Sequence, residues 1–364
     1  MRVPSAIPFL LALVLTTPAI CGQDIGVLPN ADAPLTTPTP DGSGQVTEPS
    51  IVDFPGGWHG FKYWLAVAPY RNSHAVYENP SILVSDNGVD WAIPPGGSNP
   101  VERPNAKSHL ADPDLFYDEI SDQLWLYYIS EDQYGFTDLM RTTSADGVRW
   151  NTPEIVIRTP NYRLVMPAVA KIREQYWLWT VNAGKGGCSA SSTLVQYRTS
   201  WDGVHWSAPH LTDIVQPGYK IWHISATVLE PGRFLSVSSY RDNFGDGGRL
   251  QRREPEEPRD RPFFLPGIYA MLASAFDANC GHDNLFFMLS RDGVHWVHFP
   301  RPLLTPNPGH WDGSAIYQSA LAFDRKTDLM SIWYSALDGS SWHLGLTQGD
   351  FRKTVQALRG SGSQ

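Results

Sequence analysis

A seven-residue pattern, S-x-(D/N)-G-V-x-W, occurs four times in this chain and constrains its architecture more than any other feature. The copies begin at Ser85, Ser144, Ser200 and Ser290. Asp-Gly or Asn-Gly supplies the positive φ angles of a tight hairpin turn, and the tryptophan that follows can pack between neighbouring units. Helical periodicity is hard to find after residue 25, so the repeat predicts β-sheet units that bury their faces against copies of themselves.

Residues 111–150 show one complete unit. A short apolar strand begins with two carboxylates, Asp112 and Asp114, and an aromatic strand (LWLYYIS) follows at residues 124–130. A third strand ends in the Asp-Gly turn, which leads to Trp150 and a fourth strand. Four other stretches follow the same order, so the units are residues 48–96, 109–158, 162–210, 219–303 and 312–350. The sequence therefore predicts an all-β fold, a five-bladed β-propeller of four-stranded antiparallel blades.

The fourth unit is longer than the others. We expect its second strand at residues 234–240 and its third at 284–290, with an insertion at 243–267 that includes the charged run RLQRREPEEPRDR. The insertion is either a solvated excursion or a lid or specificity loop. The propeller should occupy residues 47–358, followed by a disordered tail at 359–364.

The N-terminal residues 1–22 have the features of a secretory signal: Arg2, an apolar run at residues 7–15, and small residues before a cleavage site near Cys21. Lipid attachment at Cys21 is a weaker alternative, because Ile20 stands where a small residue is expected. We therefore expect a secreted or periplasmic protein. Residues 23–46, rich in Pro, Thr, Asp and Gly, are expected to form a flexible linker, with a few residues that pair with the last blade.

The net charge of −9 argues against a sequence-independent nucleic-acid or anionic-membrane binder, because phosphate affinity comes from Lys and Arg. No apolar run reaches the length of a membrane span. After signal cleavage two cysteines remain, Cys188 and Cys280, and in an oxidising compartment they are a candidate disulfide. We expect a monomer.

Propeller topology sorts the polar residues by face. The innermost strands begin on one face, here called the near face, together with the loops between second and third strands; the Asp-Gly turns lie on the opposite, far face. The turn aspartates are therefore predicted to be structural. The near face collects the candidate functional residues: Glu48, Glu78, Asp112, Asp114, Glu131, Asn182, Trp222, His223, Tyr240, Arg241 and Tyr317. Cys188 and Cys280 lie on equivalent near-face loops of adjacent blades.

Asp-Pro at innermost-strand starts, aromatic second strands and S-x-D-G-x-x-W turns resemble the five-bladed glycoside hydrolases of families 43 and 32. The resemblance covers nearly all of residues 48–349. Residues 77–82 (YENPSI), Trp222-His223 and residues 316–319 (IYQS) resemble more closely a poorly characterised group of secreted and phage-associated propeller proteins.

The resemblance implies near-face carboxylates that hydrolyse a glycosidic bond, one as a proton donor and one as a nucleophile or base. The family's acids in blades one and two match Glu48 and Asp112. Asp114 is expected on the same strand face as Asp112, where two neighbouring acids raise each other's pKa. The family places a glutamate at the start of blade three, where this sequence has Met166. Glu78 is the best substitute, and Glu131 is next.

Our first hypothesis from the sequence is an exported glycoside hydrolase acting on a polysaccharide or oligosaccharide, such as an arabinan or another furanoside. Its catalytic residues would be Glu48, Glu78, Asp112 and Asp114. The sugar would be held by Glu131, Asn182, Trp222, His223, Tyr240, Arg241 and Tyr317. His223 could instead be a core histidine or a ligand for a central cation.

Two alternatives stay open. A non-catalytic carbohydrate-binding propeller is favoured by Met166, and a protein-interaction platform would use the insertion at 243–267. None of the three hypotheses requires a cofactor. The sequence shows no recognisable metal-ligand spacing, although calcium in the central channel could be held by oxygen ligands.

Overall fold

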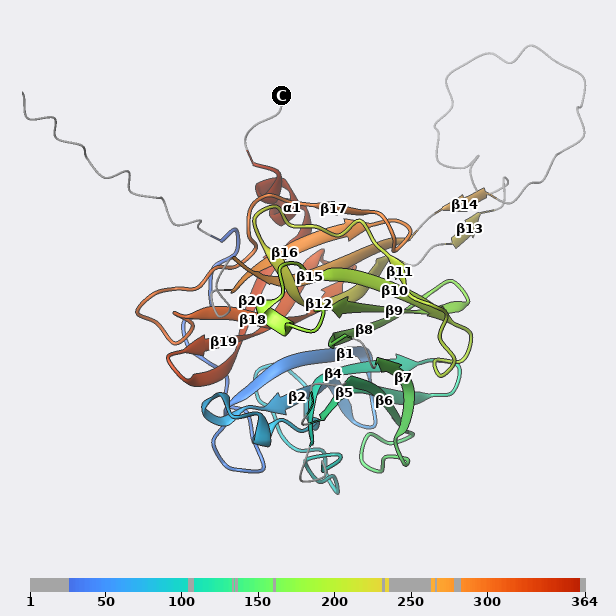
Figure 1. Ribbon diagram of the computed structural model, residues 1–364, viewed down its shortest axis with the longest axis vertical. Helices are drawn as coiled ribbons and strands as arrows, with labels where there is room; N and C mark the ends of the chain where they lie inside the picture. The colour runs from blue at the N-terminus through green and yellow to red at the C-terminus, as the bar shows by residue number, and fades with distance from the viewer. Residues whose placement is uncertain are drawn as a thin grey trace, which may run out of the picture.

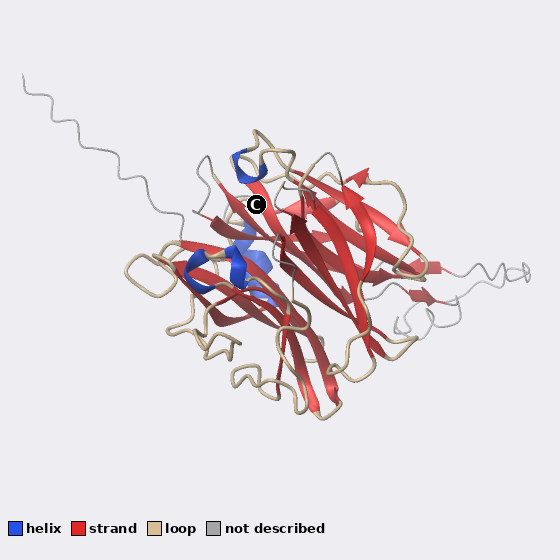
Figure 2. Ribbon diagram, turned by 60° about the horizontal axis from the view of Figure 1, so that its bottom comes forward, coloured by secondary structure: helices blue, strands red, loops and turns tan. Residues whose placement is uncertain are grey.

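Five antiparallel sheets stand around a common axis and confirm the predicted five-bladed β-propeller (Figure 1). The computed structural model describes residues 26–103, 108–132, 134, 137–159, 162–230, 233–235, 263–265, 267–277 and 283–360. Strands make up nearly all of the regular structure, and the few helices lie outside the sheets (Figure 2). No helix in these segments is both long enough and apolar enough to cross a membrane.

The blades are numbered in chain order, and the strands of each blade are given from the axis outward. Blade one holds β1 (Val46–Trp58), β2 (Phe61–Pro69) and β3 (Ser81–Ser85). Blade two holds β4 (Ser108–Asp118), β5 (Gln123–Asp132), β6 (Thr137–Ser144) and β7 (Glu154–Thr159). Blade three holds β8 (Leu164–Ile172), β9 (Gln175–Asn182), β10 (Leu194–Ser200) and β11 (His210–Leu211). Blade four holds β12 (Lys220–Glu230), β15 (Ile268–Phe276), β16 (Asp283–Ser290) and β17 (Trp296–His298). Blade five holds β18 (Ala315–Asp324), β19 (Leu329–Asp338) and β20 (Ser341–Asp350).

Four short helices connect or follow the strands: η1 (Arg71–Ser73), η2 (Ala75–Tyr77), η3 (Gly187–Ser189) and α1 (Phe351–Arg359). Helix α1 was not expected from the sequence. Asp350 caps its first turn by accepting a hydrogen bond of 2.9 Å from the backbone N–H of Lys353. The buried Leu358 then anchors the helix on the core between blades four and five.

Blades one and five have three named strands, because their fourth position is reduced to a single bridge. Ala92 pairs with Val84 in blade one, and Leu35 pairs with Leu344 in blade five. The segment that carries Leu35 was expected to be a flexible linker, yet its described part is packed: Leu28 is buried and bonds through its N–H to the carbonyl of Leu303. Apolar contacts and backbone pairing therefore fasten this segment across the last two blades.

The strand prediction for blade four was wrong in one place. The second strand is β15, whereas the expected range of 234–240 begins in β13 (Arg233–Leu235), which pairs with β14 (Phe263–Leu265) in a separate sheet. The nine-residue apolar β15 outcompetes the shorter segment, because it can bury both faces between blades. Residues 236–262, most of the insertion, lie outside the described part of the chain. Strand β12 ends and β15 begins at the far face, since Glu230 pairs with Ile268 and Tyr269 pairs with Ser290.

The repeated turns fasten each blade to the preceding one. Their four glycines, Gly88, Gly147, Gly203 and Gly293, have φ between +70° and +80°. A Cβ atom built on Gly147 would lie 2.0 Å from the Trp64 ring of blade one. The indole N–H groups of Trp179 and Trp333 donate to turn carbonyls of the following blade, at 2.8 Å and 2.7 Å. The turn aspartates bond their own loops, which agrees with a structural role.

We expect Gly147→Ala to lower the free energy of unfolding by about 2–4 kcal/mol, because it adds a left-handed φ penalty to a clash with Trp64. Gly42→Ala is the matched control: Gly42 has φ +70° but no atom within 4 Å of the added Cβ. It should cost only about 1 kcal/mol. Urea denaturation measures both variants, and equal losses would contradict the packing role of the turn.

Candidate functional site

The innermost strands of all five blades have a register break near their near-face ends, and in blade four it lies between Ile221 and His223. Register breaks between Thr47 and Ser50 in blade one, and at the equivalent places in blades two, three and five. In the first three blades the bulge begins with a residue of positive φ followed by proline: Glu48 at 57°, Asp112 at 54° and Met166 at 45°. Such angles are costly for residues other than glycine and concentrate at functional sites. Because of the bulge, the side chains of these residues no longer follow the alternation of faces along the strand.

A chain of hydrogen bonds links these three positions. The backbone N–H of Asp112 donates to Glu48 Oε2 at 2.7 Å, and the backbone N–H of Met166 donates to Asp112 Oδ2 at 2.9 Å. Each bond uses one oxygen of a carboxylate and fixes the carboxylate's orientation. Glu48 Oε1 and Asp112 Oδ1 are left facing a third side chain, His223 of blade four.

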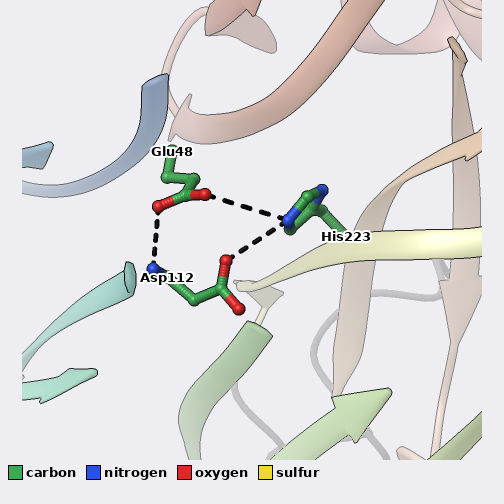
Figure 3. Close-up of side chains that lie close together, drawn as sticks. All are labelled: Glu48, Asp112 and His223. Atoms are coloured by element: carbon green, nitrogen blue, oxygen red, sulfur yellow. Dashed lines mark hydrogen bonds and ion pairs between the residues drawn. The ribbon is translucent and has the colours of Figure 1, made fainter. Parts of the chain in front are cut away.

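His223 completes a buried trio with the two carboxylates (Figure 3). Its Nε2 lies 3.2 Å from Asp112 Oδ1 and 4.0 Å from Glu48 Oε1. The exposed fractions of these side chains are only 2% for His223, 3% for Glu48 and 8% for Asp112. Tyr317 packs beside the imidazole, with ring centroids 4.1 Å apart.

The two carboxylates of the trio differ in proton affinity. Burial and the nearby charges of Asp112 and Glu78 raise the pKa of Glu48 well above its ordinary value. Burial also opposes ionisation of Asp112, but hydrogen bonding and charge from His223, with the Met166 N–H, hold the pKa of Asp112 below its ordinary value. The expectation that two neighbouring acids would raise each other's pKa is therefore wrong for Asp112.

The trio suits a divalent cation. One atom from each of Glu48, Asp112 and His223 lies within 4.8 Å of the others, the only such cluster among the described residues. Two carboxylates and an imidazole are a donor set used by zinc and other transition metals. The two carboxylates are buried together, and the pKa of Glu48 is raised. This indicates an excess of negative charge that a bound cation would neutralise. Sequence spacing missed this cluster because Glu48 and Asp112 stand 64 residues apart, in different blades.

A second group surrounds the trio toward the near face. Glu78 Oε2 lies 3.4 Å from His109 Nε2, and Glu131 forms an ion pair with Arg163. Burial, followed by the charges of Asp112 and Glu131, raises the pKa of Glu78 well above its ordinary value. Burial lowers the pKa of His109, so its imidazole is neutral near pH 7. Side-chain exposure reaches 26% at His109 and 34% at Arg163, so this group opens the site toward solvent.

His109 was missed by the sequence analysis, although it precedes Asp112 by three residues on the same strand. Asp114, by contrast, was expected in the site and lies outside it. Its two oxygens accept from the Ser50 hydroxyl at 2.9 Å and the Val169 N–H at 2.8 Å, which ties three innermost strands together. Burial raises the pKa of Asp114 to about 7.

The remaining predicted residues divide into three groups. Trp222 Nε1 donates to the Tyr317 hydroxyl at 3.0 Å, so both line the wall beside His223. Asn182 accepts from the Gly184 N–H at 2.9 Å and shapes its own loop. Tyr240 and Arg241 lie outside the described residues. Cys188 is disulfide-bonded, but Cys280 also lies outside the described residues, so their pairing stays a prediction.

Comparisons with known proteins place this fold among carbohydrate-active propellers. No family model matches the chain. A curated A type blood N-acetyl-α-D-galactosamine deacetylase of Flavonifractor plautii is 25% identical over 359 residues, which cover 86% of this chain. The chain spans less than half of that relative, since the match covers 43% of it.

Two solved structures show the same architecture. The N-acetylgalactosamine deacetylase of F. plautii, in complex with blood group B trisaccharide, aligns with a TM-score of 0.76 at 22% identity, covering 93% of this chain and 100% of that one. The catalytic domain of the Coprinopsis cinerea GH62 α-L-arabinofuranosidase aligns with a TM-score of 0.54 at 13% identity, covering 89% and 98%. The chain is thus a five-bladed β-propeller with structural neighbours among glycoside hydrolases and a deacetylase.

Proposed function

We propose that this protein is a metal-dependent deacetylase that removes the acetyl group from an N-acetylated sugar of a glycan. The observation that carries the proposal is the convergence of Glu48, Asp112 and His223 on one buried point. The F. plautii relatives support the choice of an N-acetylated sugar.

The same geometry argues against a two-carboxylate glycosidase centred on Glu48 and Asp112. Glycosidic cleavage needs two carboxyl groups about 5–9.5 Å apart that flank the bond. Here the two carboxylates approach the same imidazole, and one accepts a hydrogen bond from the backbone of the other. They are arranged to share one bound atom rather than to stand on opposite sides of a sugar.

Deacetylation forms a bond from a water oxygen to the acetyl carbon and breaks the carbon–nitrogen bond, releasing acetate and an amine. When bound, a divalent cation supplies Lewis acidity, polarising the acetyl carbonyl and lowering the pKa of a coordinated water. Glu48, Asp112 and His223 would hold this cation. Glu78 would take the proton that the attacking water loses and return it to the leaving nitrogen. The adjacent neutral His109 orients Glu78 and can donate a hydrogen bond to the substrate.

Wild-type protein should release acetate and free amine in equal amounts from glycans that end in N-acetylhexosamine. Dialysis against EDTA should abolish release, and added Zn²⁺ or Mn²⁺ should restore it. Acetate assay and elemental analysis of the bound metal measure the two effects together. Release that survives removal of all metal would contradict the proposal, and so would glycan binding without any acetate, which favours a binding module.

Glycoside hydrolysis is the second candidate, and the raised pKa of Glu78 is the observation that favours it, because a protonated carboxyl can serve as a general acid. It predicts new reducing ends instead of acetate in the same assay. We also propose that the protein is exported, supported by its signal-like N-terminus and the disulfide at Cys188.

A further inference from the structure

The seam between blades four and five contains a row of buried polar side chains behind His223. Each has one atom without a hydrogen-bond partner: His223 Nδ1, Ser225 Oγ, Ser274 Oγ and Asp283 Oδ1. All four residues are less than 9% exposed. Buried polar groups nearly always find partners, so such a row in an apolar seam requires an explanation.

Strand register places these four residues on one face of blade four. His223 pairs with Ser274 and Ser225 with Leu272 across β12 and β15, while Asp283 pairs with Phe276 across β15 and β16. Directly paired residues share a face, and so do residues two apart on a strand. Leu272 belongs to the apolar cluster that includes Ile316 and Ile332 of blade five. The polar row therefore points toward blade five.

Ser274 lies between His223 and Asp283 in this row. It is directly opposite His223 and diagonal to Asp283, so a small side chain lies between the two larger ones on this face. Two aromatic contacts enclose the space. Tyr317 of blade five covers the imidazole at 4.1 Å, and Trp222 contacts Phe276 at 5.8 Å.

We propose that Asp283 is a positioning residue for His223, holding the proton on Nδ1 through Ser274 and a buried water so that Nε2 is free to bind the cation. The inference rests on the proposed metal centre. Metal-binding histidines commonly donate their second N–H to a carboxylate or hydroxyl, which fixes the tautomer and ring orientation. A water suits this place because several buried polar atoms on this one face lack a partner in the protein.

The surroundings of Asp283 agree with such a role. Burial, reinforced by the charge of Asp277, raises the pKa of Asp283 to about 7. A carboxyl in this environment gains from a nearby N–H donor, and Nδ1 of His223 is a buried ring nitrogen on the same face without a hydrogen-bond partner. These polar residues thus extend the site from β12, which carries His223, to β16, which carries Asp283.

The experiment measures Co²⁺ affinity by chelator competition, the Co²⁺ absorption spectrum, and the His223 tautomer in the metal-free protein by ¹⁵N NMR. Asp283→Leu removes the acceptor while keeping the branched shape of the side chain, and it should weaken Co²⁺ binding about 10–100-fold and depopulate the Nδ1–H tautomer. Asp283→Asn retains an acceptor and should bind Co²⁺ within about threefold of wild type. Ser274→Val blocks the bridge and should behave like Asp283→Leu; it decides the question if the latter does not fold.

Asp312→Leu is the matched control. Asp312 is also buried with an unpartnered Oδ1, but its Oδ2 accepts from Asn30 and from Tyr334, away from the trio. This variant should lose thermal stability and keep its Co²⁺ affinity. If Asp283→Leu and Ser274→Val both keep the wild-type Co²⁺ affinity and the wild-type His223 tautomer, the role of Asp283 is overturned but the proposed metal centre is not. Failure of wild type to bind Co²⁺ would overturn the proposed metal centre as well.

Discussion

Asp112→Asn should reduce acetate release at least about 10³-fold, equivalent to about 4 kcal/mol of transition-state stabilisation, while the melting temperature changes little. The amide keeps the size of the side chain, and its oxygen can still accept from the Met166 N–H that now holds Oδ2. The negative charge that faces His223 is lost. Metal content should therefore fall together with activity.

Asp114→Asn is the control for this prediction. Asp114 is two residues away on the same strand and is equally buried, but it bonds Ser50 and Val169 rather than the trio. This variant should retain metal and most of the activity. Full activity in Asp112→Asn, or loss of metal only in Asp114→Asn, would show that the functional carboxylate has been assigned to the wrong residue.

The propeller could be predicted from the sequence because its determinants are local. The Asp-Gly turns fix hairpins within a few residues, and their spacing fixes the unit. Blade four was misplaced where this logic failed: the insertion separates β12 from β15, so adjacency in sequence no longer indicated which strand pairs next. The short apolar segment that contains β13 has the same sequence pattern as a blade strand, although β13 belongs to a separate sheet.

The site was only partly predictable. Topology correctly gathered Glu48, Asp112, His223 and Tyr317 at one face, since it depends only on strand order. Which of these residues meet depends on the bulges, whose positive φ angles redirect Glu48 and Asp112 away from the strand's alternation. That geometry separates Asp112 from Asp114, which simple alternation had placed together. The proposed cation centre is built from three blades and therefore leaves no spacing motif in the sequence.

Met166 gains a different meaning from the structure. It occupies the bulge position of blade three, equivalent to Glu48 and Asp112, and its backbone N–H orients Asp112. Its side chain joins the apolar cluster that includes Ile221 and Ile224 on either side of His223 in sequence. Under the proposed function, the missing acid therefore does not indicate a lost catalytic centre. A methionine here leaves the carboxylates of blades one and two to form the centre with His223.

Glu78→Gln should lower kcat about 10²–10⁴-fold without removing the bound metal, because general acid–base groups contribute this much and Glu78 is not among the three converging side chains. The base must be ionised to accept a proton from water. Since the pKa of Glu78 is raised, activity should increase as pH rises through a value above that of an ordinary glutamate. The variant's residual activity should lack this limb of the pH profile.

The Glu131→Gln variant distinguishes the proton-transfer role of Glu78 from a general effect of nearby negative charge. Glu131 contributes to the raised pKa of Glu78 but is engaged with Arg163. Removing its charge should shift the acidic limb to lower pH and leave the maximal rate nearly unchanged. An unaltered acidic limb in Glu78→Gln would assign the titrating base elsewhere in the trio's surroundings, with His109 the next group to replace, since it lies 3.4 Å from Glu78.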